Sequence, residues 1–329
     1  MKKYSKWFLG ILLVLLILEI VILAPKTLNK SPSIVADDIN ESHVNSDKVE
    51  QLMQGVHSVG TKDGNKDWEL WADEALDFKT ETQWTLKNVK AIFFGNDGVY
   101  FTVTGKQGFV EPETKNMEVK GDVVTRSSNG YVFKTEKVSY TSVDRSLVSN
   151  DPISMVGPKD KNGNPLRLNG IGIKADLNES TMKVQSQVVA RKTFVKGQKA
   201  KIRSNTALFS GKNQKAFFSG DVVIDFDNMR LTGPEAELDY DQKKGVVKTM
   251  FVKNGVRVSD DVKYATSDNV RVLFEEEKFV FRGAPRVVQN NDELRGEEIV
   301  FLHRGETVKV MKARARVEEV EGQKKAGEK

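Results

Sequence analysis

The chain has 329 residues and a formal net charge of +5, with 29% charged and 39% hydrophobic residues, a composition typical of a folded protein. It has no cysteine, which excludes a disulfide scaffold, a thiolate nucleophile and any cysteine-bound zinc or iron–sulfur centre. The charge is too small for its length to indicate a nucleic-acid-binding protein. At about 150 residues per domain, the length predicts about two domains.

The first segment predicts a membrane anchor. Residues 1–6 carry three lysines, and residues 7–24 form an apolar run that as a helix would be about 27 Å long, close to the hydrocarbon thickness of a bilayer. The run ends without the small-residue pattern of a signal-peptide cleavage site, so we expect it to stay attached. The lysines place residues 1–6 in the cytoplasm, and everything after residue 25 then lies outside.

Glu19 is an ionisable side chain inside this apolar run. Such a group either contacts a partner helix in the membrane or, near the end of the span, reaches the interface. The sequence leaves both interpretations open.

Residues 25–60 are polar and have no sustained period, which predicts a tether. From about Trp68 onward, apolar and polar residues alternate, and turn signals such as Asn162-Gly163 separate the runs. In residues 218–226, for example, the even positions are apolar or glycine and several odd positions are acidic. Alternation of this kind predicts β-strands with one dry and one wet face.

The β-region contains a repeated hairpin unit. Three segments align without gaps: residues 105–124, 204–223 and 267–286. In this alignment Gly121, Gly220 and Gly283 coincide, and the first two copies continue as Gly-Asp-Val-Val. Each unit has one apolar face that it cannot bury alone. We therefore expect the hairpins to stack into a sandwich or an open roll, whose interior is either a filled core or an apolar slot.

Enzyme functions lack their residues. His43 and His57 fall in the predicted tether and His303 is isolated, so neither a catalytic triad nor a zinc site is complete. Asp225 and Asp227 alternate onto the strand face opposite the apolar one, where we expect solvent. No catalytic residue, metal ligand or cofactor is predicted.

The anchor, the repeat and the order of the motifs resemble the OstA-like proteins of the lipopolysaccharide-transport bridge. Residues 1–195, with Trp68-Glu69-Leu70-Trp71 and the motif Leu168-Asn169-Gly170-Ile171-Gly172, look like LptC, the bridge protein with one membrane anchor. Residues 199–318, with their best match from Lys201 to Tyr240, look like the bridge protein LptA. Two proteins usually made separately are here one chain.

The resemblance implies an all-β fold of two stacked OstA-like β-jellyrolls after one N-terminal transmembrane helix. The implied order is a cytoplasmic start (1–6), an anchor (7–24), a periplasmic tether (25–60), an LptC-like roll (61–196), an LptA-like roll (197–318) and a disordered tail (319–329). We expect a strand near 184–195 to pair with one near 200–210, because the junction is short.

The implied function is to bind lipopolysaccharide acyl chains in a hydrophobic groove and pass them from an inner-membrane ABC extractor toward the outer membrane. The implied partners are lipopolysaccharide, an LptB/LptF/LptG-like complex, and a further bridge protein or LptD-like translocon that docks on an edge strand. The alternative is a structural or adhesive β-repeat protein with a filled core.

Strand parity assigns the inward side chains that would line the groove. They are Val119, Val123, Phe133, Val138, Tyr140, Phe209, Phe218, Val222, Ile224, Phe226, Leu231, Leu238, Phe279, Phe281, Leu294 and Ile299. For any one of them, plain core packing remains the alternative to lipid contact.

Overall fold

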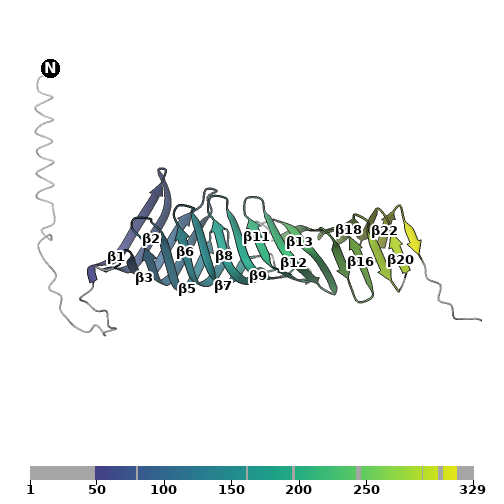
Figure 1. Ribbon diagram of the computed structural model, residues 1–329, viewed down its shortest axis with the longest axis horizontal. Coiled ribbons are helices and arrows are strands. Elements are labelled where there is room, and N and C mark those ends of the chain that lie inside the picture. Colours follow the sequence, from purple (N-terminus) through teal and green to yellow (C-terminus); the bar gives the residue numbers. More distant parts are fainter. Residues whose placement is uncertain are drawn as a thin grey trace, which may run out of the picture. The chain divides into compact units, whose positions relative to one another are not determined.

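In the computed structural model, the residues that are described are 49–78, 81–160, 162–194, 197–241, 246–290, 292–302 and 307–316, and their regular elements are all β-strands (Figure 1). No helix within these ranges is long and apolar enough to cross a membrane. The predicted anchor, Glu19, the tail and the tether up to residue 48 lie outside the described residues.

Nine strands form a continuous antiparallel meander in the first part of the described chain, each paired with the next (Figure 1). They are β1 (Val49–Lys62), β2 (Asn65–Phe78), β3 (Trp84–Phe94), β4 (Tyr100–Val110), β5 (Met117–Ser127), β6 (Val132–Thr141), β7 (Ser146–Lys159), β8 (Pro165–Asp176) and β9 (Thr181–Thr193).

The second part continues the same sheet, and most of its strands are shorter. They are β10 (Lys199–Ser204), β11 (Thr206–Ser210), β12 (Lys215–Phe226), β13 (Met229–Asp241), β14 (Val246–Lys253), β15 (Val256–Ser259), β16 (Lys263–Ser267), β17 (Asn269–Leu273), β18 (Lys278–Arg282), β19 (Arg286–Gln289), β20 (Asp292–Arg295), β21 (Glu298–Leu302), β22 (Thr307–Met311) and β23 (Arg314–Arg316).

The sheet is folded into two layers, because its strands are interrupted near their middles. We call layer A the one that contains β10, β15, β16, β19, β20 and β23, and layer B the one that contains β11, β14, β17, β18, β21 and β22. β12 crosses from one to the other: Lys215–Ser219 pairs with β11, and Val223–Phe226 pairs with β10. β9 likewise pairs with both β10 and β11.

The glycines of the sequence repeat lie at these corners. Gly121, Gly220 and Gly283 have φ of 80°, 79° and 81°, values that a residue with a Cβ rarely adopts. The ladders of β5 and β12 skip at Lys120/Val123 and Ser219/Val222. A bulge of this kind bends a strand and lets it switch layers. The repeat is therefore a repeat of bent hairpins.

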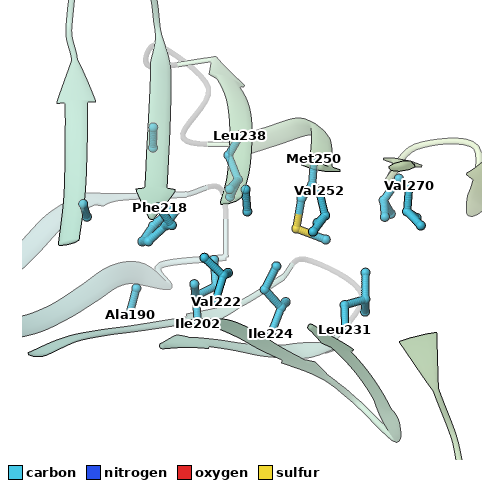
Figure 2. Packing of buried hydrophobic residues seen from close by; sticks show 14 of the residues in the cluster. Ala190, Ile202, Phe218, Val222, Ile224, Leu231, Leu238, Met250, Val252 and Val270 are labelled. Carbon is cyan, nitrogen blue, oxygen red and sulfur yellow. The ribbon is translucent and has the colours of Figure 1, made fainter. Parts of the chain in front are cut away.

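The apolar faces of the two layers meet in the interior. In Figure 2, Phe218, Leu238 and Met250 extend from one layer toward Val222, Ile224 and Leu231 of the other. Phe218 and Val222 belong to the same strand, on either side of its corner. One core cluster extends from Phe133 to Phe301 and a second from Trp68 to Leu177.

The structure bears on two predictions from the sequence, the end of the tether and the strand pairing at the junction. The tether was expected to reach residue 60, but β1 begins at Val49, so that part of the prediction is wrong. The alternation there is poor because β1 is an edge strand, exposed on both faces for most of its length. The expected junction pairing is confirmed: Thr193 lies opposite Lys199, and Val188 opposite Ser204.

Candidate functional site

Each layer ends in a row of turns, and the two rows face each other across an opening that we call the mouth. Followed back from β10 through the ladders of β9 to β3, layer A ends in the turns between β3 and β4, β5 and β6, and β9 and β10. The layer B turns include those between β6 and β7, β8 and β9, and β17 and β18. The side chains that meet across the mouth decide whether a ligand can reach the apolar interior.

Among the described residues we distinguish four pockets between the layers, and their linings are mostly apolar. In chain order their empty volumes, counting the open side, are about 410, 630, 930 and 430 Å³. The first is lined by residues such as Phe101 and Val138, and the second by Val99 and Phe133. The third, the largest, lies over the junction of β9 and β10, and the fourth is lined by Phe279 and Phe281.

The first three pockets share walls. Phe101, Phe133 and Met182 line both the first and the second pocket. Tyr131, Phe209 and Tyr240 line both the second and the third. The pockets therefore follow one another between the layers, separated by side chains rather than by backbone.

Two tyrosines stand in the wall between the second and third pockets. Burial raises the pKa of Tyr131, and burial followed by the neighbouring Tyr131 raises that of Tyr240, since an apolar site disfavours the phenolate. Tyr240 donates a hydrogen bond from its hydroxyl to the carbonyl oxygen of Ser210, 3.2 Å away. Both side chains are therefore neutral, and they present mainly ring surface to the pockets.

A polar latch closes the mouth beside the N-terminal core. From the β6–β7 turn of layer B, Arg145 Nε contacts Asp67 Oδ1 at 2.7 Å, and its Nη2 donates to the carbonyl of Phe94 at 2.6 Å. Its Nη1 donates to Asn96 Oδ1 at 2.6 Å. Asp67 also accepts a hydrogen bond from Tyr140 Oη at 2.8 Å. Asp67, Phe94 and Asn96 lie at the layer A edge, so these bonds tie the two layers together.

Farther along the mouth, three aromatic rings bridge the layers. Phe194 and Phe226 come from layer A, and Phe274 from the β17–β18 turn of layer B. The ring of Phe274 stacks on Phe194 with centroids 5.3 Å apart and meets the edge of Phe226 at 5.8 Å. All three line the third pocket. This aromatic clasp has no hydrogen bond to break, in contrast to the latch.

A buried ion pair lies on the rim of the third pocket. Lys192 Nζ is 2.7 Å from Asp160 Oδ2 and 2.6 Å from the carbonyl oxygen of Asn164. Burial acts to raise the pKa of Asp160, but hydrogen bonds from Lys192 and from the N–H groups of Asn164 and Asn162 outweigh it and hold the pKa below its ordinary value. The negative charge of Asp160 therefore balances the positive charge of Lys192, and this part of the rim can border an apolar ligand.

The predicted groove residues all point inward, but they fall into two groups. Nine of them line one of the four pockets: Phe133, Val138, Phe209, Phe218, Ile224, Phe226, Leu238, Phe279 and Phe281. The other seven line none of the four and pack in or against the core clusters: Val119, Val123, Tyr140, Val222, Leu231, Leu294 and Ile299.

Several pocket residues were missed by strand parity. Tyr131, Phe194 and Phe274 lie at or beside turns, where the period-2 pattern stops. An aromatic residue directly next to a turn signal could have indicated Tyr131, which follows Gly130. Among the described residues, no group of three or more His, Asp or Glu side chains could hold a metal ion. His57 lies in β1 rather than in a tether, and its ring stacks on Trp71.

Comparison with known proteins divides the chain at the β9–β10 turn. The family "Lipopolysaccharide-assembly, LptC-related" matches residues 10–193, and the family "LptA/(LptD N-terminal domain) LPS transport protein" matches residues 201–307. Among solved structures, the chain is similar to LptH, described as the LptA homologous periplasmic component of the lipopolysaccharide transport device from Pseudomonas aeruginosa. The similarity has 15% identity and a TM-score of 0.33 over 36% of this chain and 95% of that one.

A search of curated proteins gives no match. The LptC-related match alone spans more than half of the 329 residues. The chain therefore belongs to the LptC-related lipopolysaccharide-assembly family, and it continues after residue 200 into a segment that matches the LptA/LptD N-terminal family of lipopolysaccharide-transport proteins.

Proposed function

We propose that this protein is an inner-membrane-anchored periplasmic bridge that holds the acyl chains of lipopolysaccharide between its two layers and passes them toward the outer membrane. In this proposal residues 1–6 are cytoplasmic, residues 7–24 anchor the chain, and two open rolls, 61–196 and 197–318, carry the lipid. The proposal includes no catalytic step and no cofactor.

The observation that carries the proposal is the row of apolar pockets along the mouth. A hydrocarbon tail gains about 0.8 kcal/mol for each CH₂ group removed from water, and it needs no specific polar partner. The third pocket is lined by Ala200, Ile202, Phe218 and Met250 among other apolar side chains. A structural β-repeat protein would need no such space, because its layers could close until their side chains interlock.

The two ends of the sheet suit docking to other strands. β1 pairs with β2, and β22 with β21, and no further strand of the described residues pairs with either of them. Exposed edges are a liability unless another strand covers them. We propose that an LptB/LptF/LptG-like extractor supplies the lipid and the energy at one end. A further bridge protein or an LptD-like translocon receives the lipid at the other.

The proposal is tested by photo-crosslinking from two adjacent phenylalanines of β12. Phe218 is buried and lines the third pocket, whereas Phe217 alternates to the outer face. We expect p-benzoylphenylalanine at position 218 to form adducts with lipopolysaccharide in cells, and the same probe at position 217 to form few. The two sites have the same residue type, strand and probe, so they differ only in the face presented. Equal labelling at both positions, or none at 218, would contradict the proposal.

A further inference from the structure

Three cations lie side by side across the junction of the two family matches. In the ladder, Arg167 of β8 lies directly opposite Arg191 of β9, and Arg191 lies directly opposite Lys201 of β10. Arg167 and Arg191 are exposed and Lys201 is half-buried. We call these three residues the cationic row. Directly opposed side chains on paired strands have Cβ atoms about 5 Å apart.

The row has no acidic partner of its own within the described part of the chain. Asp225 lies opposite Lys201, but its two oxygens contact Arg203 Nη2 at 3.2 Å and Arg230 Nε at 2.6 Å. Asp160 is bound by Lys192. No salt bridge described for these ranges involves Arg167, Arg191 or Lys201, and like charges directly opposed destabilise a sheet. An external anion would offset that repulsion.

The row lies on the outer face of layer A, behind the wall of the third pocket, because its three residues alternate with the inward side chains of Leu168, Ala190 and Ile202. Arg191 belongs to the lining of the third pocket, and so do Ala190 and Ile202, the inward neighbours of two residues of the row. Arg191 and Lys201 lie only a few residues from the β9–β10 turn at the mouth, so a molecule whose tail occupied that pocket would reach the row by folding its polar end over the layer A rim. The ligand that matches both features is an amphiphile with an anionic head group.

We propose that Arg167, Arg191 and Lys201 form a binding site for phosphate groups on the head of the lipid whose tails occupy the third pocket. The site rests on the proposed function and adds to it the chemistry of the head group. Guanidinium groups bind phosphate oxygens in pairs with fixed geometry, and a lysine adds a point charge. Because β8 and β9 belong to one family match and β10 to the other, the site is complete only where the two segments pair.

The test measures binding of the full-length chain in detergent to lipopolysaccharide and to the same lipopolysaccharide after phosphatase treatment. The variant is Arg167→Gln/Arg191→Gln/Lys201→Gln. We expect its affinity for the phosphorylated form to fall by about threefold to thirtyfold at low salt, since each solvent-screened contact is weak. Affinity for the dephosphorylated form should not change. The difference should shrink at high salt, where screening is complete within a few ångströms.

The matched control removes three lysines from the layer B side: Lys174→Gln/Lys183→Gln/Lys212→Gln. Lys174 and Lys183 are also directly opposed and exposed, and none of the three lines any of the four pockets. We expect this control to keep the preference of the unaltered chain for the phosphorylated form. If both triple variants lost the same affinity for the phosphorylated form, the effect would come from net charge alone and the proposed site would be overturned.

Two further outcomes separate this site from its alternatives. If the row variant binds both lipid forms as the unaltered chain does, the site is wrong while the transport proposal stands. If the unaltered chain binds neither form, the transport proposal itself fails. Inorganic phosphate is the third probe: if it abolishes the preference at concentrations far below those of the buffer salt, the row is a free-phosphate site and the head-group assignment is overturned.

Discussion

At the scale of single residues, Arg145 ties the two layers together at the mouth through three side-chain hydrogen bonds. Its backbone has φ of 50°, a conformation that is costly for a residue with a Cβ. Its side chain reaches Asp67, Phe94 and Asn96 of layer A. Asp67 is 4% exposed, so its charge depends on Arg145 for compensation. The hydrogen bonds from the three nitrogens of its guanidinium group offset this backbone strain.

We therefore predict that Arg145→Ala destabilises the protein by about 3–5 kcal/mol, because it leaves the carboxylate of Asp67 buried without a cation. Denaturant unfolding measures the change. Adding Asp67→Asn to that variant should recover part of the loss, since the orphaned charge is then removed. Arg126→Ala is the control: Arg126 is exposed, and its loss should change stability by less than about 0.5 kcal/mol. Similar effects of Arg145→Ala and Arg126→Ala would show that the latch contributes nothing.

At the scale of the strand, the corner sets where the apolar face changes layer. Gly220 has φ of 79°, and a Cβ there would lie 2.5 Å from Asn205 Nδ2. Gly211, in the turn before the same strand, has no such constraint: the nearest atom to an added Cβ is 3.6 Å away. A comparison of the two glycines therefore shows whether the bend needs the conformation that only glycine readily adopts at position 220.

We predict that Gly220→Ala lowers the free energy of unfolding by about 1–3 kcal/mol, from left-handed backbone strain and crowding against Asn205. Gly211→Ala should be close to neutral. Chemical denaturation of both variants at one protein concentration makes the comparison. If Gly220→Ala proves as harmless as Gly211→Ala, the repeat glycine is not needed for the bend.

The strands and their corners also show which parts of the fold the sequence can predict. Alternation identified the inward faces of β12 and β18, and the aligned glycines marked the corners, because both patterns arise from local backbone geometry. β1 was missed because an edge strand exposed on both faces has no reason to alternate. The pocket residues Phe194 and Phe274 were missed because their rings meet across the mouth, and the pairing of distant turns leaves no local signal.

At the scale of the whole described region, the apolar interior continues across the boundary between the two family matches. Phe133 and Leu168 precede the β9–β10 turn and Ile224 and Phe281 follow it, yet all four belong to one core cluster. The third pocket takes side chains from both sides of that turn. If the pockets act in series, a lipid that enters beside Phe133 must cross the third pocket before it reaches Phe281.

That requirement gives a test of passage rather than of binding. Ala200 lines the third pocket, and we predict that Ala200→Trp fills it and blocks movement beyond it. With photo-crosslinkers at Phe133 and Phe281, lipopolysaccharide adducts should persist at 133 and fall at least severalfold at 281. Leu208→Trp adds the same ring on the outer face of β11, where Leu208 is 36% exposed, and should leave both positions labelled. Unchanged labelling at 281 in Ala200→Trp would mean that lipid bypasses the third pocket, because a route through it cannot tolerate an indole of that size.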